Sequence, residues 1–313
     1  MLIPWLSLLG GFVVLTGGAD GLVRGSSALA RRFGMSPLMI GLTVVAIGTS
    51  MPELMVSLDA ALRGSSEVAL GNVIGSNISN VGLILGLSAL VATLKVKAQV
   101  VRFDAPVLVG VSLLLGGLLA DGTLTRYDGG VLVVVLIGYV FFTIYAARAE
   151  KGPAVRAEFD EGVPEPKTLT VDLLFLGGGL AALVLGARFL VGGAITIAEA
   201  WGVSEAVIGL TLVAVGTSLP ELATSAVAAY RNEGDIAVGN AVGSSIFNIL
   251  GILGITVLVE PLGAGGISVV DGLVMIGMAV LVLPFMRTGF ALNRWEGGAL
   301  LLAYGSYLFY LIA

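Results

Sequence analysis

The chain lacks cysteine and histidine altogether, and charged residues make up only 12% of its 313 residues. Without cysteine it can form neither disulfides nor thiolate metal sites. Without histidine it can build neither a Ser-His pair, nor the H-E-x-x-H zinc motif, nor an imidazole proton relay. So few catalytic groups remain that we expect no enzyme. Soluble domains carry about 25% charged residues, and the 57% of hydrophobic residues here indicates a membrane protein.

Apolar stretches long enough to cross a membrane recur along the whole chain. A helix needs roughly 17 to 25 apolar residues to cross about 30 Å of hydrocarbon. Short charged or Gly/Pro-containing breaks separate ten such stretches, at residues 2–22, 36–61, 67–93, 104–120, 127–147, 169–190, 204–229, 236–258, 268–286 and 294–312. The sequence therefore predicts an all-α membrane protein with ten transmembrane helices.

The basic residues are distributed unevenly over the connectors between these stretches. If the connectors are numbered in chain order, the odd ones carry 13 of the 16 Lys and Arg residues. Because basic residues in short loops stay in the cytoplasm, we expect an integral cell-membrane protein with cytoplasmic odd connectors and both termini extracellular. The long polar connector 148–168 is predicted to be a cytoplasmic linker between residues 1–147 and 169–313. The two halves should form one integrated transmembrane domain.

The two halves carry the same two blocks of sequence. Residues 41–57 match residues 209–225 at 12 of 17 positions, and residues 71–86 match residues 239–254 at 9 of 16, both at an offset of 168. The unchanged offset indicates duplication. Five spans per half is an odd number, so the second copy must enter the membrane from the opposite side. Inverted repeats of this kind place a transporter's substrate site near the midplane, on discontinuous helices.

Each repeat carries one glutamate deep in an apolar stretch, Glu53 in the first half and Glu221 in the second. Carboxylates at this depth are costly and usually functional. Pro52 and Pro220 precede them, and proline inside a helix removes a backbone hydrogen bond. We therefore predict that helices 2 and 7 are discontinuous, with freed carbonyls facing an ion or a cavity. A passive kink, or a glutamate that merely holds the bundle together, is the structural alternative.

The stretch after each glutamate carries a polar stripe, because polar residues recur there every four positions. The stripes consist of Asn72, Ser76 and Asn80, and of Asn240, Ser244 and Asn248. Hydrogen bonding between helices is the alternative role, chiefly for Asn72 and Asn240. Together with the carboxylates, the threonine and serine hydroxyls and the freed carbonyls, the stripes form an all-oxygen donor set. Such a set suits hard cations, above all Ca²⁺, rather than transition metals.

The doubled pattern G-T-S-x-P-E-L followed by G-N-x-x-G-S-x-I-x-N resembles the alpha repeats of the cation/calcium exchanger superfamily, most of all its prokaryotic sodium/calcium exchangers. The resemblance covers nearly the whole chain and implies antiport of Ca²⁺ against Na⁺ by alternating access. It implies Ca²⁺ ligands from Glu53, Glu221, Thr49 and Thr217. It implies Na⁺ ligands from Ala46, Ser50, Ser76, Asn80, Ala214, Ser218, Ser244 and Asn248.

One position of this chain departs from the pattern of the archaeal exchangers that it resembles, and two others distinguish between branches of the superfamily. Archaeal exchangers of this type place an acidic residue where this chain has Asn248, so the site here carries two formal negative charges. The proton-coupled branch places Glu where this chain has Gly75 and Gly243, which favours sodium. Proton-coupled antiport of Ca²⁺ or another divalent cation remains the alternative, and the inverted repeat speaks against a calcium channel. The expected partners are the bilayer and the transported ions; no cofactor, nucleic acid or protein partner is implied.

Overall fold

The computed structural model describes residues 2–149, 168–201, 214–265 and 267–312, and apart from four two-residue strands its regular elements are helices. Within these residues seven helices are long and apolar enough to cross a membrane, or eight if the bent pair Pro37–Thr49 and Met51–Leu62 is counted as one span. The helical segments of the described residues fall into ten groups, as the sequence predicts. Most of the predicted linker 148–168 and the start of the predicted span 204–229 lie outside the described residues.

The two halves repeat the same order of elements. The first half contains α1 (Leu2–Phe33); α2 (Pro37–Ile40), η1 (Gly41–Val45), α3 (Ala46–Thr49) and α4 (Met51–Leu62); α5 (Ser66–Ser79), η2 (Asn80–Leu85) and α6 (Gly86–Val91); η3 (Val100–Asp104), α7 (Ala105–Leu118) and η4 (Leu119–Asp121); and α8 (Arg126–Ala149). The second contains α10 (Leu169–Ala200); α12 (Ala214–Thr217) and α13 (Leu219–Tyr230); α14 (Gly234–Phe247), η6 (Asn248–Leu253) and α15 (Gly254–Val259); α16 (Val269–Arg287); and α17 (Arg294–Ile312). The segments η1, η2, η3 and η6 are π-helical.

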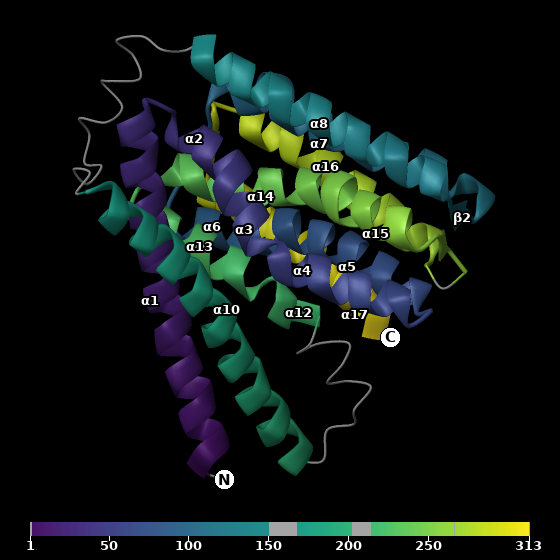
Figure 1. Cartoon of the computed structure of the whole chain (residues 1–313), viewed down its shortest axis with the longest axis horizontal. Coiled ribbons are helices and arrows are strands. Elements are labelled where there is room, and N and C mark those ends of the chain that lie inside the picture. Colours follow the sequence, from purple (N-terminus) through teal and green to yellow (C-terminus); the bar gives the residue numbers. More distant parts are fainter. Residues whose placement is uncertain (1, 150–167, 202–213, 266, 313) are drawn as a thin grey trace.

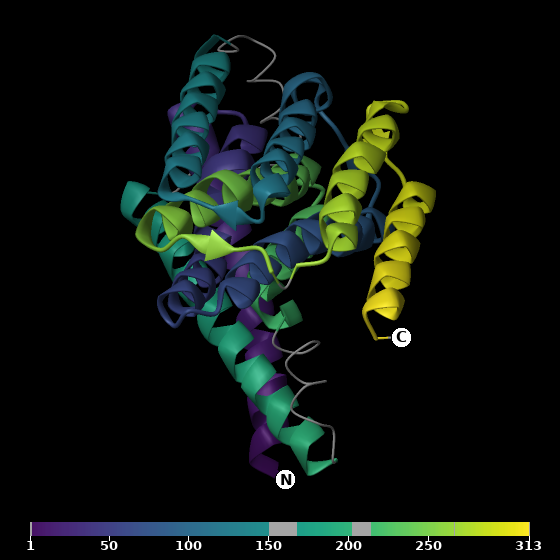
Figure 2. The same cartoon turned by 90° about the vertical axis from the view of Figure 1, so that its right-hand side faces the viewer.

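Helices α1 and α10 lie side by side and extend together away from the other helices (Figures 1 and 2). Glycines let their backbones approach closely: Gly11, Gly18 and Gly25 on α1 correspond, at the offset of 168, to Gly179, Gly186 and Gly193 on α10. A methyl group at Gly18 would lie 2.6 Å from the backbone nitrogen of Leu183. This is the close packing that small residues permit between membrane helices.

Both of these helices are longer than predicted. Each has 32 residues, whereas the expected spans ended at residues 22 and 190. Arg24, Arg31 and Arg32 fall in the connector between the predicted spans 2–22 and 36–61, but they lie within α1. Charged residues suggest the end of a span because they usually lie where a helix meets polar surroundings. Helices α1 and α10 continue past their charged residues because they pack against each other along their length.

Four short strands in the connectors between helices join the two halves. Strand β1 (Leu94–Lys95) pairs with β4 (Ala291–Leu292), and β2 (Thr123–Leu124) pairs with β3 (Leu262–Gly263). The strands β1 and β4 lie in connectors 3 and 9, and β2 and β3 in connectors 4 and 8. Odd connectors therefore meet odd ones and even meet even, as ten crossings require. We call these two sides of the molecule the odd face and the even face.

The interior of the bundle is built around α5 and α14, which follow the broken helices in the two repeats. In α14, every residue from Ile236 to Phe247 is buried. It packs against η1, α3 and α13, while α5 packs against α4. The residues of the predicted polar stripes are buried, apart from Asn72, which is part-buried. Figure 1 shows α5 and α14 beside the broken helices, which are interrupted at Ser50 and Ser218.

Candidate cation site

Both Pro-Glu helices are interrupted where the sequence predicts. Ser50 has φ −83° and ψ 6°, and Ser218 has φ −87° and ψ 5°, so neither continues the α-helix. In the first half the segments on either side of the break are bent by 42°. Pro52 lies in the first turn of the new helix, where the missing N–H costs nothing. Glu53 and Glu221 consequently lie in the first turns of α4 and α13, where the helix dipole favours a negative charge.

Each glutamate side chain accepts a hydrogen bond from the serine of the other repeat. The hydroxyl of Ser50 donates to Glu221 Oε1 at 2.9 Å, and that of Ser218 donates to Glu53 Oε1 at 3.2 Å. Both glutamates are 1% exposed. In the part of the chain that the structure describes, no lysine or arginine pairs with either of them. The second carboxylate oxygen, Oε2, has no hydrogen-bond partner in either residue.

The polar stripes of the following helices contribute further oxygen atoms. Ser76 Oγ lies 3.5 Å from Ser218 Oγ, and Ser244 donates to the carbonyl oxygen of Ala46 at 3.4 Å. Asn80 and Asn248 are each 1% exposed and begin the π-helical turns η2 and η6. Such turns inside α-helices are frequent at functional sites. Both polar atoms of the Asn80 amide, Nδ2 and Oδ1, and Oδ1 of Asn248 are buried without a hydrogen-bond partner.

Asn72 and Asn240 bind the helix backbone instead. The amide of Asn72 donates to the carbonyl oxygen of Glu53 at 3.0 Å and to Ser57 Oγ at 2.8 Å. The amide of Asn240 donates to the carbonyl oxygen of Glu221 at 3.2 Å and to Ser225 at 2.9 Å. Bonding between helices, the alternative considered above, is therefore what these two residues do. Sequence reasoning missed the two serines, although each stands one helical turn after its glutamate.

The threonines stand directly before the breaks. Thr49 is fully buried, and its hydroxyl donates to the carbonyl oxygen of Val45 at 3.0 Å, with Asn240 Oδ1 3.1 Å away. Thr217 ends α12, of which Ala214 is the first residue. The residues before Ala214 lie outside the described part of the chain.

The site can hold one or more cations with a total charge of about +2. It has two buried carboxylates, and no group of three or more His, Cys, Asp or Glu side chains exists among the described residues. Hydroxyl, amide and carbonyl oxygens must therefore complete any coordination shell, as they do for hard cations. Buried polar atoms without partners are costly. Bound cations would satisfy such oxygens, which here are Glu53 Oε2, Glu221 Oε2 and the amide oxygens of Asn80 and Asn248.

Comparison with known proteins gives one consistent result. The family model described as sodium/calcium exchanger protein matches residues 3–145 and again residues 171–313. The chain is 36% identical to the sodium/calcium exchanger MaX1 of Methanosarcina acetivorans, over 98% of this chain and 97% of that protein. It is 42% identical to the inner membrane protein YrbG of Escherichia coli, over 83% and 81%. A solved structure of the sodium-calcium exchanger NCX_Mj, soaked without Na⁺ and Ca²⁺, superposes with a TM-score of 0.85 at 34% identity, covering 99% of both chains.

Proposed function

Because the chain belongs to the sodium/calcium exchanger family, we propose that it is a secondary antiporter that exchanges Ca²⁺ for Na⁺ across the membrane by alternating access. The observation that carries this proposal is the pair of buried carboxylates, Glu53 and Glu221. Each is bound by a serine of the opposite repeat, and each keeps one oxygen without a partner. Transporters built from inverted repeats bind their substrate at the interface between the repeats, which agrees with this arrangement.

In this proposal Ca²⁺ binds between Glu53 and Glu221, with further oxygens from Thr49 and Thr217. The charge of the ion then cancels that of the two carboxylates, so the loaded site can cross a dry barrier at lower cost than the empty one. Na⁺ uses overlapping positions at the carbonyls of Ala46 and Ala214 and at the side chains of Ser50, Ser76, Asn80, Ser218, Ser244 and Asn248. The partnerless amide oxygens of Asn80 and Asn248 support this assignment.

The proposal includes an orientation. The excess of Lys and Arg in the odd connectors places the odd face in the cytoplasm. Both termini are then extracellular, and the linker 148–168 is cytoplasmic, between a first five-helix unit of residues 1–147 and a second of residues 169–313.

Calcium uptake into proteoliposomes tests the coupling ion, with sodium, potassium and proton gradients imposed separately and the membrane potential recorded. We expect uptake driven by the sodium gradient. Uptake driven by the pH gradient without sodium would instead establish proton coupling. Uptake without any counter-ion on the far side would establish a channel.

The site is tested with Glu53→Gln and Glu221→Gln, which keep the shape of the side chain and remove its charge. Each should reduce sodium-driven uptake by at least about 100-fold, because a buried ion would lose a charged ligand worth several kcal/mol. Glu67→Gln is the matched control, because Glu67 is an exposed acid on α5. Substantial exchange in either glutamate variant would refute the site.

A further inference from the structure

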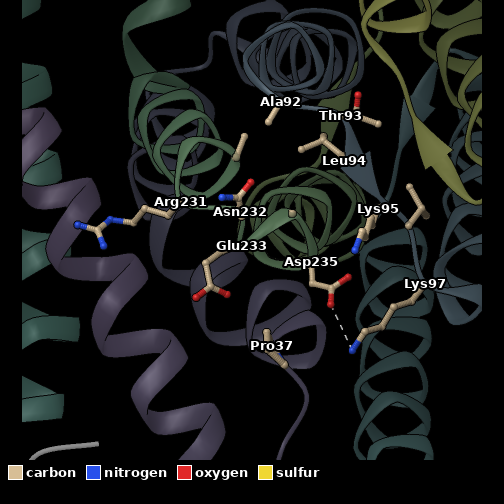
Figure 3. Close-up of a pocket in the computed structure, with 13 residues that line it drawn as sticks. Pro37, Ala92, Thr93, Leu94, Lys95, Lys97, Arg231, Asn232, Glu233 and Asp235 are labelled. Atoms are coloured by element: carbon tan, nitrogen blue, oxygen red, sulfur yellow. Dashed lines mark ion pairs between the residues drawn. The ribbon is translucent and has the colours of Figure 1, made fainter. Parts of the chain in front are cut away.

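An ion pair joins α1 to the end of α13 on the odd face. Asp20 of α1 pairs with Arg231, the residue that caps α13, and only 32% and 29% of their side-chain surfaces are exposed. Arg24, one turn further along α1, also forms an ion pair with Asp20, with 2.9 Å between Arg24 Nε and Asp20 Oδ2. Figure 3 shows Arg231 pointing away from the neighbouring pocket and toward α1. Helix α1 packs along α13 around this pair.

The inverted repeat predicts a counterpart of this contact on the even face, but the charges there do not match. At the offset of 168, Asp20 corresponds to Arg188 on α10, and Arg231 corresponds to Arg63 at the end of α4. The counterpart of the attractive pair is therefore arginine against arginine. Both arginines are exposed, and among the residues that the structure describes Arg63 forms an ion pair with Asp59 of its own helix. In the described residues α10 does not pack along α4 as α1 packs along α13.

The candidate site itself does not distinguish the two faces. Each of its residue types occurs once in each repeat, as in the pairs Glu53 and Glu221, Ser50 and Ser218, and Asn80 and Asn248. In an inverted-repeat transporter the access side changes as one repeat or bundle moves against the other around the fixed site. Because the two repeats match, we take the alternate state to be the one in which they have exchanged conformations. The alternate state would then separate Asp20 from Arg231 and bring Arg188 close to Arg63.

We propose that the Asp20–Arg231 ion pair is a conformational latch that favours the state closed at the odd face. The latch rests on the alternating access of the proposed function. A partly exposed ion pair shifts an equilibrium by up to about five-fold, and repulsion between the two arginines shifts it in the same direction. Apparent affinity scales with the population of the competent state. Ions therefore bind more tightly from the even face than from the odd face, although the ligands are the same.

Because the chain contains no cysteine, distances across both faces can be measured with spin labels on introduced cysteines. One pair, Gly17→Cys with Tyr230→Cys, reports on the odd face. Its counterpart at the offset of 168, Leu185→Cys with Leu62→Cys, reports on the even face. All four side-chain positions are exposed. Double electron-electron resonance in lipid nanodiscs without added Na⁺ or Ca²⁺ then gives the distance distribution at each face.

Three variants are compared in each labelled background. Asp20→Asn removes the latch with little change of shape, and Arg188→Asp creates an ion pair with Arg63 on the even face. Both should shift the populations up to about five-fold, toward longer distances at the odd face and shorter ones at the even face. Arg24→Gln is the matched control, because it removes only a partner of Asp20 within the same helix, and it should shift neither distribution.

Unchanged distributions in both Asp20→Asn and Arg188→Asp overturn the latch, and so does a shift of equal size in Arg24→Gln. The two substitutions lie at opposite faces, so misfolding of one variant, detected by size-exclusion chromatography, leaves the other to decide. The labels report conformation, not flux. If the unsubstituted protein shows no sodium-driven calcium uptake, the proposed function is refuted. The distance shifts would still establish the latch.

Discussion

Replacing Gly18 by alanine should push α1 and α10 apart. The new methyl group would lie 2.6 Å from the nitrogen of Leu183 and 2.9 Å from the carbonyl oxygen of Gly179. Both are backbone atoms, so no side-chain rotation can make room. Ordinary contacts begin near 3.4 Å, and the helices must therefore separate by just under about 1 Å. Separation at one glycine also loosens the contacts at Gly11 and Gly25, because all three lie on one face of α1.

Overpacking of this kind typically costs about 1–3 kcal/mol. Alanine is also a better helix former than glycine, by up to about 1 kcal/mol, which would partly mask the cost. Gly17→Ala removes this ambiguity. It carries the same gain in helix propensity, but a methyl group there meets no atom within 4 Å. The difference between the two variants therefore isolates the contact between α1 and α10.

The assay is the apparent melting temperature of purified protein, followed by fluorescence-detected size-exclusion chromatography after heating. Gly18→Ala should melt about 2–10 °C below Gly17→Ala, the shift expected for a loss of this size. Gly186→Ala, whose methyl group would lie 2.4 Å from the nitrogen of Leu15, should behave like Gly18→Ala. Equal melting temperatures for Gly17→Ala and Gly18→Ala would show that the helices do not pack at this distance.

Two further predictions concern the hydrogen bonds around the glutamates. Ser50→Ala and Ser218→Ala should each weaken the apparent sodium affinity about ten-fold or more, because each removes a hydrogen bond to a charged group. Flux assays at varied sodium concentration should give similar losses of affinity for the two variants. A large difference between them would contradict the two-fold symmetry of the site. Asn240→Ala removes the donor to the Glu221 carbonyl and to Ser225, so it should lower stability by about 2 kcal/mol in the melting assay while reducing calcium affinity far less than Glu221→Gln does.

The sequence predicted the number of helical groups and the position of both breaks, because apolar length and the Pro-Glu pairs are local signals. The extent of α1 and α10 was not predicted. Asp20, Arg24 and Arg188 look like the ends of spans when hydropathy alone is considered, whereas the heptad spacing of the glycines is the signal that continues through them. Sequence alone also could not assign Ser50 to Glu221 rather than to Glu53, since that choice depends on how the two repeats cross.

The π-helical turns at Asn80 and Asn248 were likewise not predicted. N-V-G-L-I-L and N-I-L-G-I-L contain no proline, and the asparagine and glycine in each do not distinguish a π-helical turn from an α-helical one. We therefore attribute the extra residue per turn to packing in the bundle. The consequence for the site is that the sequence identifies which side chains lie on the inner face, whereas the orientation of the two amides follows from the tertiary structure.

The ion pairs between separate elements support a difference between the two faces that goes beyond one contact. Among the described residues three such pairs lie on the odd face: Asp20 with Arg231, Arg32 with Asp172, and Lys97 with Asp235. Their counterparts at the offset of 168 are Arg188 and Arg63, Ala200 and Pro4, and Gly265 and Glu67, and none of these can form an ion pair. Both repeats contribute the same residue types to the site, whereas these ion pairs around it have no counterparts on the even face. In the proposed latch the attraction at the odd face and the repulsion between Arg188 and Arg63 at the even face favour the same access state, so neutralising Asp20 should weaken that preference while leaving the ligands untouched.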